Sequence, residues 1–162
     1  MALEIERKFL VEAGAEPPPA GTEPRRIAQG YVSISPDGTE VRLRDAAGRW
    51  FLTLKRGSGM VRTEVERELT EAEFTGLWPA TAAARLEKDR YSFEAGGTLF
   101  HLDVYHGALS GLRTVEVEFD SEEAARAFDC PAWFGPEVTS LAAYKNQSLA
   151  VDGMPPHEGE SP

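Results

Sequence analysis

The chain has 162 residues, of which 41% are hydrophobic and 9% aromatic, and its 17 basic and 27 acidic side chains give a formal net charge of −10. This length and composition suit one globular domain with a core that needs no disulfide. The acidic balance argues against nucleic acid or an anionic membrane as a general partner, because both require a cationic face. No run of about 18 apolar residues is present, so no membrane-spanning segment is predicted.

The dominant hydrophobic period is two, which is typical of β-strands. Two short turns stand out, Pro36-Asp37-Gly38 and Gly96-Gly97, and both suit antiparallel hairpins. Thr70 and Glu73 form the pattern of a capping box and predict that a helix follows. The predicted strands are 3–11, 27–34, 39–44, 49–55, 62–69, 85–93, 99–105 and 114–119, and further helices are predicted over 121–128 and 139–151.

About eight closely spaced strands with few helices predict an antiparallel barrel or sandwich with the helices outside. No internal repeat or domain boundary is visible, so residues 1–152 are predicted to form one domain and 153–162 a disordered tail. The N-terminal segment 1–8 alternates charged and apolar residues and lacks the apolar core of a secretory signal. Together with the single cysteine, Cys130, this favours a reducing, cytoplasmic location.

Alternation also assigns strand faces, because residues i, i+2 and i+4 point the same way. One face of nearly every predicted strand is almost purely Arg/Lys or Glu/Asp, as in Glu4, Glu6 and Lys8. These faces either contact solvent or, if the sheet closes into a barrel, line a polar tunnel. Buried acids and bases need ions of both signs, a polyanion and divalent cations, and this is the chemistry of phosphoryl transfer. Oxygen donors without a His/Cys cluster favour Mg²⁺ or Mn²⁺.

The segment Glu4-Ile5-Glu6-Arg7-Lys8 resembles the Glu-x-Glu-x-Lys signature of the CYTH superfamily, the triphosphate tunnel metalloenzymes. The rest of the family's series follows in order over roughly residues 3–150, and the resemblance is closest to short bacterial members that resemble inorganic triphosphatases. The further matching segments are Gln29-Gly30-Tyr31, Val41-Arg42-Leu43-Arg44, Leu52-Thr53-Leu54-Lys55, Arg62-Thr63-Glu64-Val65-Glu66, Glu87-Lys88-Asp89-Arg90-Tyr91, Leu102-Asp103-Val104, Val115-Glu116-Val117-Glu118-Phe119 and Tyr144-Lys145-Asn146.

This resemblance implies a closed, eight-stranded antiparallel barrel that forms a tunnel, in a homodimer, with a small triphosphate as the ligand and one or two Mg²⁺ or Mn²⁺ ions as cofactors. The residues that it implies for triphosphate binding are Lys8, Arg42, Arg44, Lys55, Arg62, Lys88, Arg90 and Lys145, which include all four lysines of the chain. The residues that it implies for holding or orienting metal are Glu4, Glu6, Glu64, Glu66, Asp103, Glu116 and Glu118, with Glu4, Glu6, Glu116 and Glu118 as the expected direct ligands.

The expected activity is metal-dependent hydrolysis of inorganic tripolyphosphate to pyrophosphate and phosphate. Lys88 is the candidate general base, because the neighbouring Arg90 disfavours its charged form, and Tyr31 is expected to hydrogen-bond and orient it. Three alternatives stay open: an adenylate cyclase that makes cyclic AMP and pyrophosphate from ATP, a thiamine triphosphatase, and a polyphosphate-binding module without turnover. Seven acids facing the ligand argue against the last of these, because a pure anion binder gains nothing from them.

Several other side chains leave two interpretations open. His101 shares a strand face with Asp103 and is either a metal ligand or a polar side chain without a role. Trp78, Trp133 and Phe134 either pack against the fold or stack on an organic part of a substrate.

Overall fold

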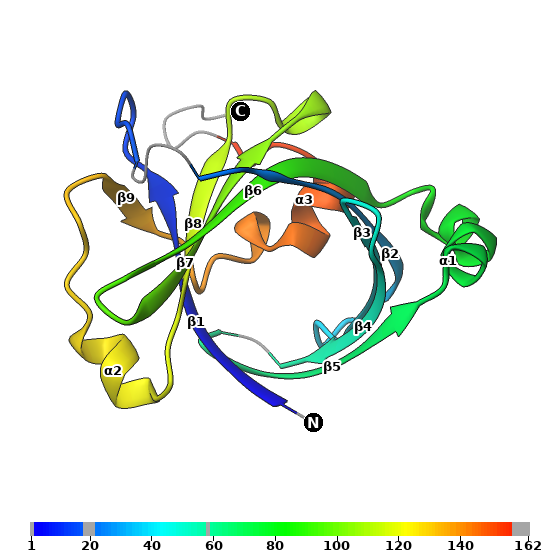
Figure 1. Cartoon of the computed structure of the whole chain (residues 1–162), viewed down its shortest axis with the longest axis horizontal. Helices are drawn as coiled ribbons and strands as arrows, with labels where there is room; N and C mark the ends of the chain where they lie inside the picture. The colour runs from blue at the N-terminus through cyan, green and yellow to red at the C-terminus, as the bar shows by residue number, and fades with distance from the viewer. Residues whose placement is uncertain (1, 18–21, 58, 157–162) are drawn as a thin grey trace.

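Nine strands make up much of the described part of the chain, and Figure 1 shows β1 to β8 curving around a central opening with β9 outside it. The computed structural model describes residues 2–17, 22–57 and 59–156, so the last six residues of the predicted tail lie outside the described part. None of the helices in that part is long and apolar enough to cross a membrane. The strands are β1 (Ala2–Val11), β2 (Arg25–Ile34), β3 (Glu40–Ala46), β4 (Trp50–Arg56), β5 (Val61–Leu69), β6 (Arg85–Ala95), β7 (Thr98–Tyr105), β8 (Arg113–Glu118) and β9 (Phe134–Glu137).

Strand β1 closes the sheet into a barrel. The order is β5-β4-β3-β2-β6-β7-β8-β1, and β1 also pairs with β5, so both edges of the sheet meet on one strand. Glu4 lies opposite Arg62 of β5, whereas Lys8 lies opposite Glu116 of β8. All these pairings are antiparallel. The prediction of a closed, eight-stranded antiparallel barrel is therefore confirmed.

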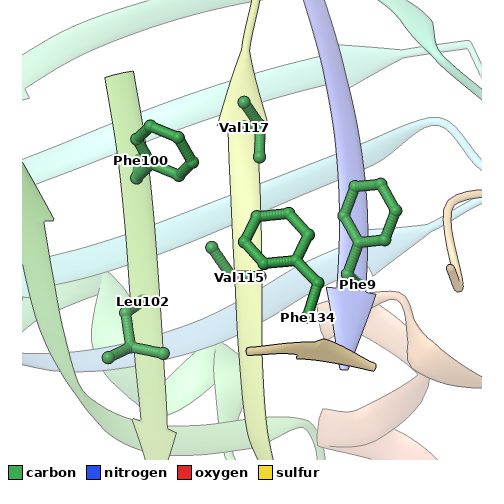
Figure 2. Packing of buried hydrophobic residues seen from close by; sticks show 6 residues of the cluster. All are labelled: Phe9, Phe100, Leu102, Val115, Val117 and Phe134. Atoms are coloured by element: carbon green, nitrogen blue, oxygen red, sulfur yellow. The ribbon is translucent and has the colours of Figure 1, made fainter. Parts of the chain in front are cut away.

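The main apolar cluster lies outside the barrel wall. Figure 2 shows Phe9, Phe100 and Val117 on β1, β7 and β8, covered by Phe134 of β9. The rings of Phe9 and Phe134 are 4.8 Å apart between centroids, and Val115 and Val117 have no exposed surface. Because the apolar faces of these strands are covered from outside, their charged faces must point into the barrel. Strand β9 was not predicted; it has only four residues and one of them is a proline.

Two of the three predicted helices lie outside the barrel. Helix α1 (Glu71–Leu77) begins at Thr70, whose capping box with Glu73 is present as predicted. Phe74 of this helix packs on Trp50 of β4 and on Trp78 in the following 3-10 helix η1 (Trp78–Thr81). Helix α2 (Glu122–Ala127) begins after Ser121 and lies against β1.

The third predicted helix differs from the expectation in extent and in position. It forms as a 3-10 helix η3 (Ala142–Tyr144) and a separate helix α3 (Asn146–Asp152). The break falls where Lys8 Nζ donates a hydrogen bond of 2.7 Å to the Tyr144 carbonyl, which a continuous helix would use itself. Leu149 of α3 packs with Leu86 and Tyr105 of the inner barrel face, so α3 lies across one end of the barrel (Figure 1) rather than outside it.

Candidate active site

The interior of the barrel holds a cavity of about 720 Å³ with strongly charged walls. Every strand from β1 to β8 contributes at least one residue to its lining, and the C-terminal segment 144–147 completes part of it. Of the predicted site residues, all but Lys88 and Asp103 line the cavity. The lining residues that were predicted are Glu4, Glu6, Lys8, Tyr31, Arg42, Arg44, Lys55, Arg62, Glu64, Glu66, Arg90, Glu116, Glu118 and Lys145.

Opposite charges meet across neighbouring strands around the wall. Lys55 Nζ of β4 lies 2.8 Å from Glu4 Oε2 and 3.6 Å from Glu64 Oε2. Glu66 accepts a hydrogen bond of 2.9 Å from Thr53 Oγ1, its neighbour in the β4–β5 register. Such pairing offsets part of the cost of burying the charges. Glu64 and Glu66 therefore already have partners within the protein, on β4.

Arg42, Arg44 and Arg90 gather in one part of the cavity, and Arg44 has no carboxylate partner among the described residues. Arg42 is 5% exposed, and its Nε has no hydrogen-bond partner among the described residues. Burial, together with the guanidinium groups of Arg42 and Arg90, lowers the pKa of Arg44 to about 9. Because Arg stays protonated in proteins, the part of this shift that comes from Arg42 and Arg90 reflects repulsion, which a bound polyanion would relieve.

Three carboxylates gather at another part of the wall. Glu4, Glu6 and Glu118 each offer an oxygen within 4.8 Å of the others. Glu6 Oε2 is buried and has no hydrogen-bond partner in the part of the chain that the structure describes, and burial together with the nearby Glu116 raises the pKa of Glu6 to about 7. Grouped carboxylates with an unpartnered buried oxygen are a donor set that fits a hard divalent cation. Glu116 adds charge beside them, and it lies 3.5 Å from Arg90 and 3.9 Å from Lys8.

Lys88 and Asp103 are fully buried and do not themselves line the cavity, but they lie on the inner strand faces next to Arg90, which does. Asp103 accepts hydrogen bonds of 2.8 Å from Lys88 Nζ and from both Nε and Nη2 of Arg90. Burial alone would raise the pKa of Asp103, but Arg90 and Lys88 outweigh it and lower this pKa to about 2. Burial also lowers the pKa of Lys88 to about 7, although Asp103 opposes that shift. Both oxygens of Asp103 are thus used within the protein.

The prediction that Tyr31 forms a hydrogen bond with Lys88 is wrong. In the described part of the chain no hydrogen bond joins them; Tyr31 Oη accepts one of 2.6 Å from Gln29 Nε2 instead. The strand register explains this difference, because Lys88 lies opposite Ile27, four residues away from Tyr31 along β2. Four residues of strand correspond to about 13 Å.

The structure adds lining residues that the sequence reasoning missed. Glu40 is 4% exposed and lines the cavity 3.9 Å from Arg42, its neighbour but one on β3. It continues the alternation of Arg42 and Arg44, so the same period-two signal was available to find it. Trp78, Trp133 and Phe134 pack outside the barrel, whereas Phe51 lines the cavity.

The lumen of this closed barrel carries closely spaced basic side chains and a group of three carboxylates. Such a site defines a class of protein that binds a polyanion and a cation together. The CYTH domain family model matches residues 2–136, and the chain belongs to this family. It is 48% identical over 149 residues to an inorganic triphosphatase of Nitrosomonas europaea, covering 91% of this chain and 97% of that protein. It is 34% identical over 151 residues to an inorganic triphosphatase of Acetivibrio thermocellus, covering 92% and 94%.

The comparison with solved structures agrees with this family membership. The crystal structure of the inorganic triphosphatase NE1496 superimposes with a TM-score of 0.69 at 46% identity, covering 93% of this chain and 96% of that one.

Proposed function

We propose that this protein is a metal-dependent inorganic triphosphatase that hydrolyses tripolyphosphate to pyrophosphate and orthophosphate. The observation that carries the proposal is the crowding of buried guanidinium groups in the lumen, where Arg42 Nε has no hydrogen-bond partner among the described residues and burial, with the cationic neighbours, lowers the pKa of Arg44. A small, multiply charged anion would satisfy these groups. The names of the two relatives support the choice of tripolyphosphate.

The basic side chains would bind and orient the substrate. Arg42 and Arg44 of β3 meet Arg90 of β6 in one cavity, so their planar guanidinium groups can contact several phosphate oxygens at once. Lys55, Arg62, Lys8 and Lys145 would add charge along the chain of phosphates. Holding the phosphates in line with an attacking water is the main contribution of such a site.

Glu4, Glu6 and Glu118 would hold the divalent cation, and Glu116 would act beside them. When bound, Mg²⁺ or Mn²⁺ supplies Lewis-acid stabilisation of the charge on the phosphate oxygens. Glu64 and Glu66 would position Lys55 and the lumen wall, since each already has a partner on β4. Asp103 would act through Lys88 and Arg90.

Lys88 is our candidate for the group that accepts the proton of the attacking water. A general base works best when its pKa is close to the operating pH, and burial lowers the pKa of Lys88 to about 7. When neutral, its amine can donate to Asp103 Oδ2 and keep its lone pair for water. Tyr31 accepts a hydrogen bond from Gln29 and would donate one from its hydroxyl to a phosphate oxygen.

The test is an assay of the purified protein with Mg²⁺ or Mn²⁺ and tripolyphosphate, ATP or thiamine triphosphate in separate reactions. Orthophosphate from tripolyphosphate supports the proposal. Cyclic AMP from ATP, or preference for thiamine triphosphate, would establish one of the alternative activities instead. Binding of tripolyphosphate without any product under either metal would show a polyphosphate-binding module.

Matched variants sharpen this assay. Arg42→Met, in the lumen, is expected to lower kcat/KM for tripolyphosphate by about 100-fold or more, since it removes a buried, charge-assisted contact. Arg49→Met is the control, because Arg49 pairs with Glu68 on the exposed surface. Lys88→Ala is expected to remove most turnover and the rise of the rate through pH 7. Near-normal turnover by the Lys88 variant would exclude it as the base.

A second copy of the chain is the partner that we propose. Leu3, Leu54 and Val65 are 68%, 44% and 37% exposed on the outer faces of β1, β4 and β5, where Leu54 and Val65 are cross-strand neighbours. An apolar surface of this kind on a sheet is typical of an interface. Light scattering is expected to show a dimer that Leu54→Glu converts to a monomer. We also infer a cytoplasmic location, supported by the single cysteine Cys130.

A further inference from the structure

His101 lies beside the three grouped carboxylates and has so far no role. On β7 it is the cross-strand neighbour of Ser92 on β6 and of Glu116 on β8, so its ring faces the lumen. Its Nδ1 is 2.8 Å from Ser92 Oγ, and its Nε2 is 3.5 Å from Glu118 Oε1. The imidazole therefore bridges a hydroxyl and one carboxylate of the group.

The chemistry of the two neighbours selects the tautomer of the ring. An ionised carboxylate only accepts hydrogen bonds, so the nitrogen that faces Glu118 must carry the proton. The other nitrogen, Nδ1, then accepts a hydrogen bond from the Ser92 hydroxyl. In the neutral ring, both contacts are satisfied together only when the proton is on Nε2.

Each of the three carboxylates has one partner that orients it. Glu4 is held by Lys55, and Glu6 is held by Arg62. Glu118 has the most exposed side chain of the three, at 38% against 17% for Glu4 and 5% for Glu6. It consequently has the most freedom to rotate away, and the side chain that restrains it is His101.

His101 contacts one of the three carboxylates but is not itself a member of that group. The ligand atoms that lie within 4.8 Å of one another belong to Glu4, Glu6 and Glu118, and they include no histidine nitrogen. We propose that His101 is a positioning residue that turns Glu118 toward a divalent cation, and that Ser92 holds the other edge of its ring through the contact with Nδ1. This inference rests on the cation site proposed above.

Partners of this kind typically change metal affinity by 10–100-fold. The experiment is calorimetric titration of the full-length protein with Mn²⁺ in the absence of substrate. His101→Leu is expected to weaken Mn²⁺ binding about 10-fold. His101→Gln, whose amide can donate from nearly the position of Nε2, is expected to stay within about 3-fold of the unmodified protein, and the shorter His101→Asn is expected to behave like His101→Leu.

The control is His106→Leu. His106 Nε2 lies 2.8 Å from Asp89 Oδ2, a histidine–carboxylate contact of the same kind that lies away from the lumen cavity. This variant is expected to bind Mn²⁺ as the unmodified protein does. Circular dichroism establishes that each variant is folded, and His101→Asn gives the loss-of-contact result if His101→Leu does not fold.

Two results would overturn the inference: unchanged Mn²⁺ binding by His101→Leu and His101→Asn, or equal weakening by His101→Gln, which would make the ring itself the ligand. Mn²⁺ binding is measured apart from tripolyphosphate hydrolysis, so the two proposals fail separately. Loss of hydrolysis with His101-dependent Mn²⁺ binding refutes the function alone. No Mn²⁺ binding by the unmodified protein refutes the cation site and this inference together.

Discussion

Replacing Asp103 by Asn is expected to destabilise the protein strongly, although Asp103 does not line the cavity. Its carboxylate has no exposed surface and accepts three hydrogen bonds of 2.8 Å from Lys88 and Arg90. An amide would remove the charge that compensates these two buried cations and would turn an N–H donor toward one of them. Breaking a buried ion pair on one side costs about 3–5 kcal/mol.

Urea unfolding followed by circular dichroism measures this loss as a lower transition midpoint. The lowered pKa of Asp103, about 2, means that its contribution is present above its ordinary pKa of 3.8 and is lost as the pH falls toward 2. Asp89→Asn is the control, because Asp89 pairs with His106 and Arg26 in a partly exposed position and should cost less than about 1 kcal/mol. A loss below about 1 kcal/mol for Asp103→Asn would refute the reasoning.

Three further predictions concern packing and the cation site. Phe134→Ala should lower the free energy of unfolding in urea by about 3–5 kcal/mol, because it leaves a cavity in the apolar cluster outside the barrel. An unchanged transition midpoint would contradict that role. Gly30→Ala places a Cβ 2.5 Å from Thr81 and should cost about 1–3 kcal/mol, whereas Gly76→Ala, with open space around it, should be neutral or stabilising. Burial raises the pKa of Glu6 to about 7, so the protein without metal should lose stability as the pH rises from 4.5 to 7, and Mn²⁺ should raise Tm more at pH 8 than at pH 5. Equal Tm shifts at the two pH values would argue against a cation on Glu6.

Local features of the sequence determined the elements and much of the site. Period-two alternation predicted the eight barrel strands, and Thr70 and Glu73 predicted the start of α1. Alternation also grouped the charged side chains correctly by face. Strand β9 was not predicted, because its four residues include Gly135 and Pro136 and show no hydrophobic period.

Which strand face points inward was decided by the tertiary structure alone, because a charged face and an apolar face alternate with the same period. Pairing of β1 with β5 closes the barrel, and Phe134 covers the apolar side from outside, so the charges line the lumen. Strand register decided which charged groups meet: it separated Tyr31 from Lys88 and joined His101 to Glu118. Contacts of this kind depend on the alignment of distant strands, which no local pattern records.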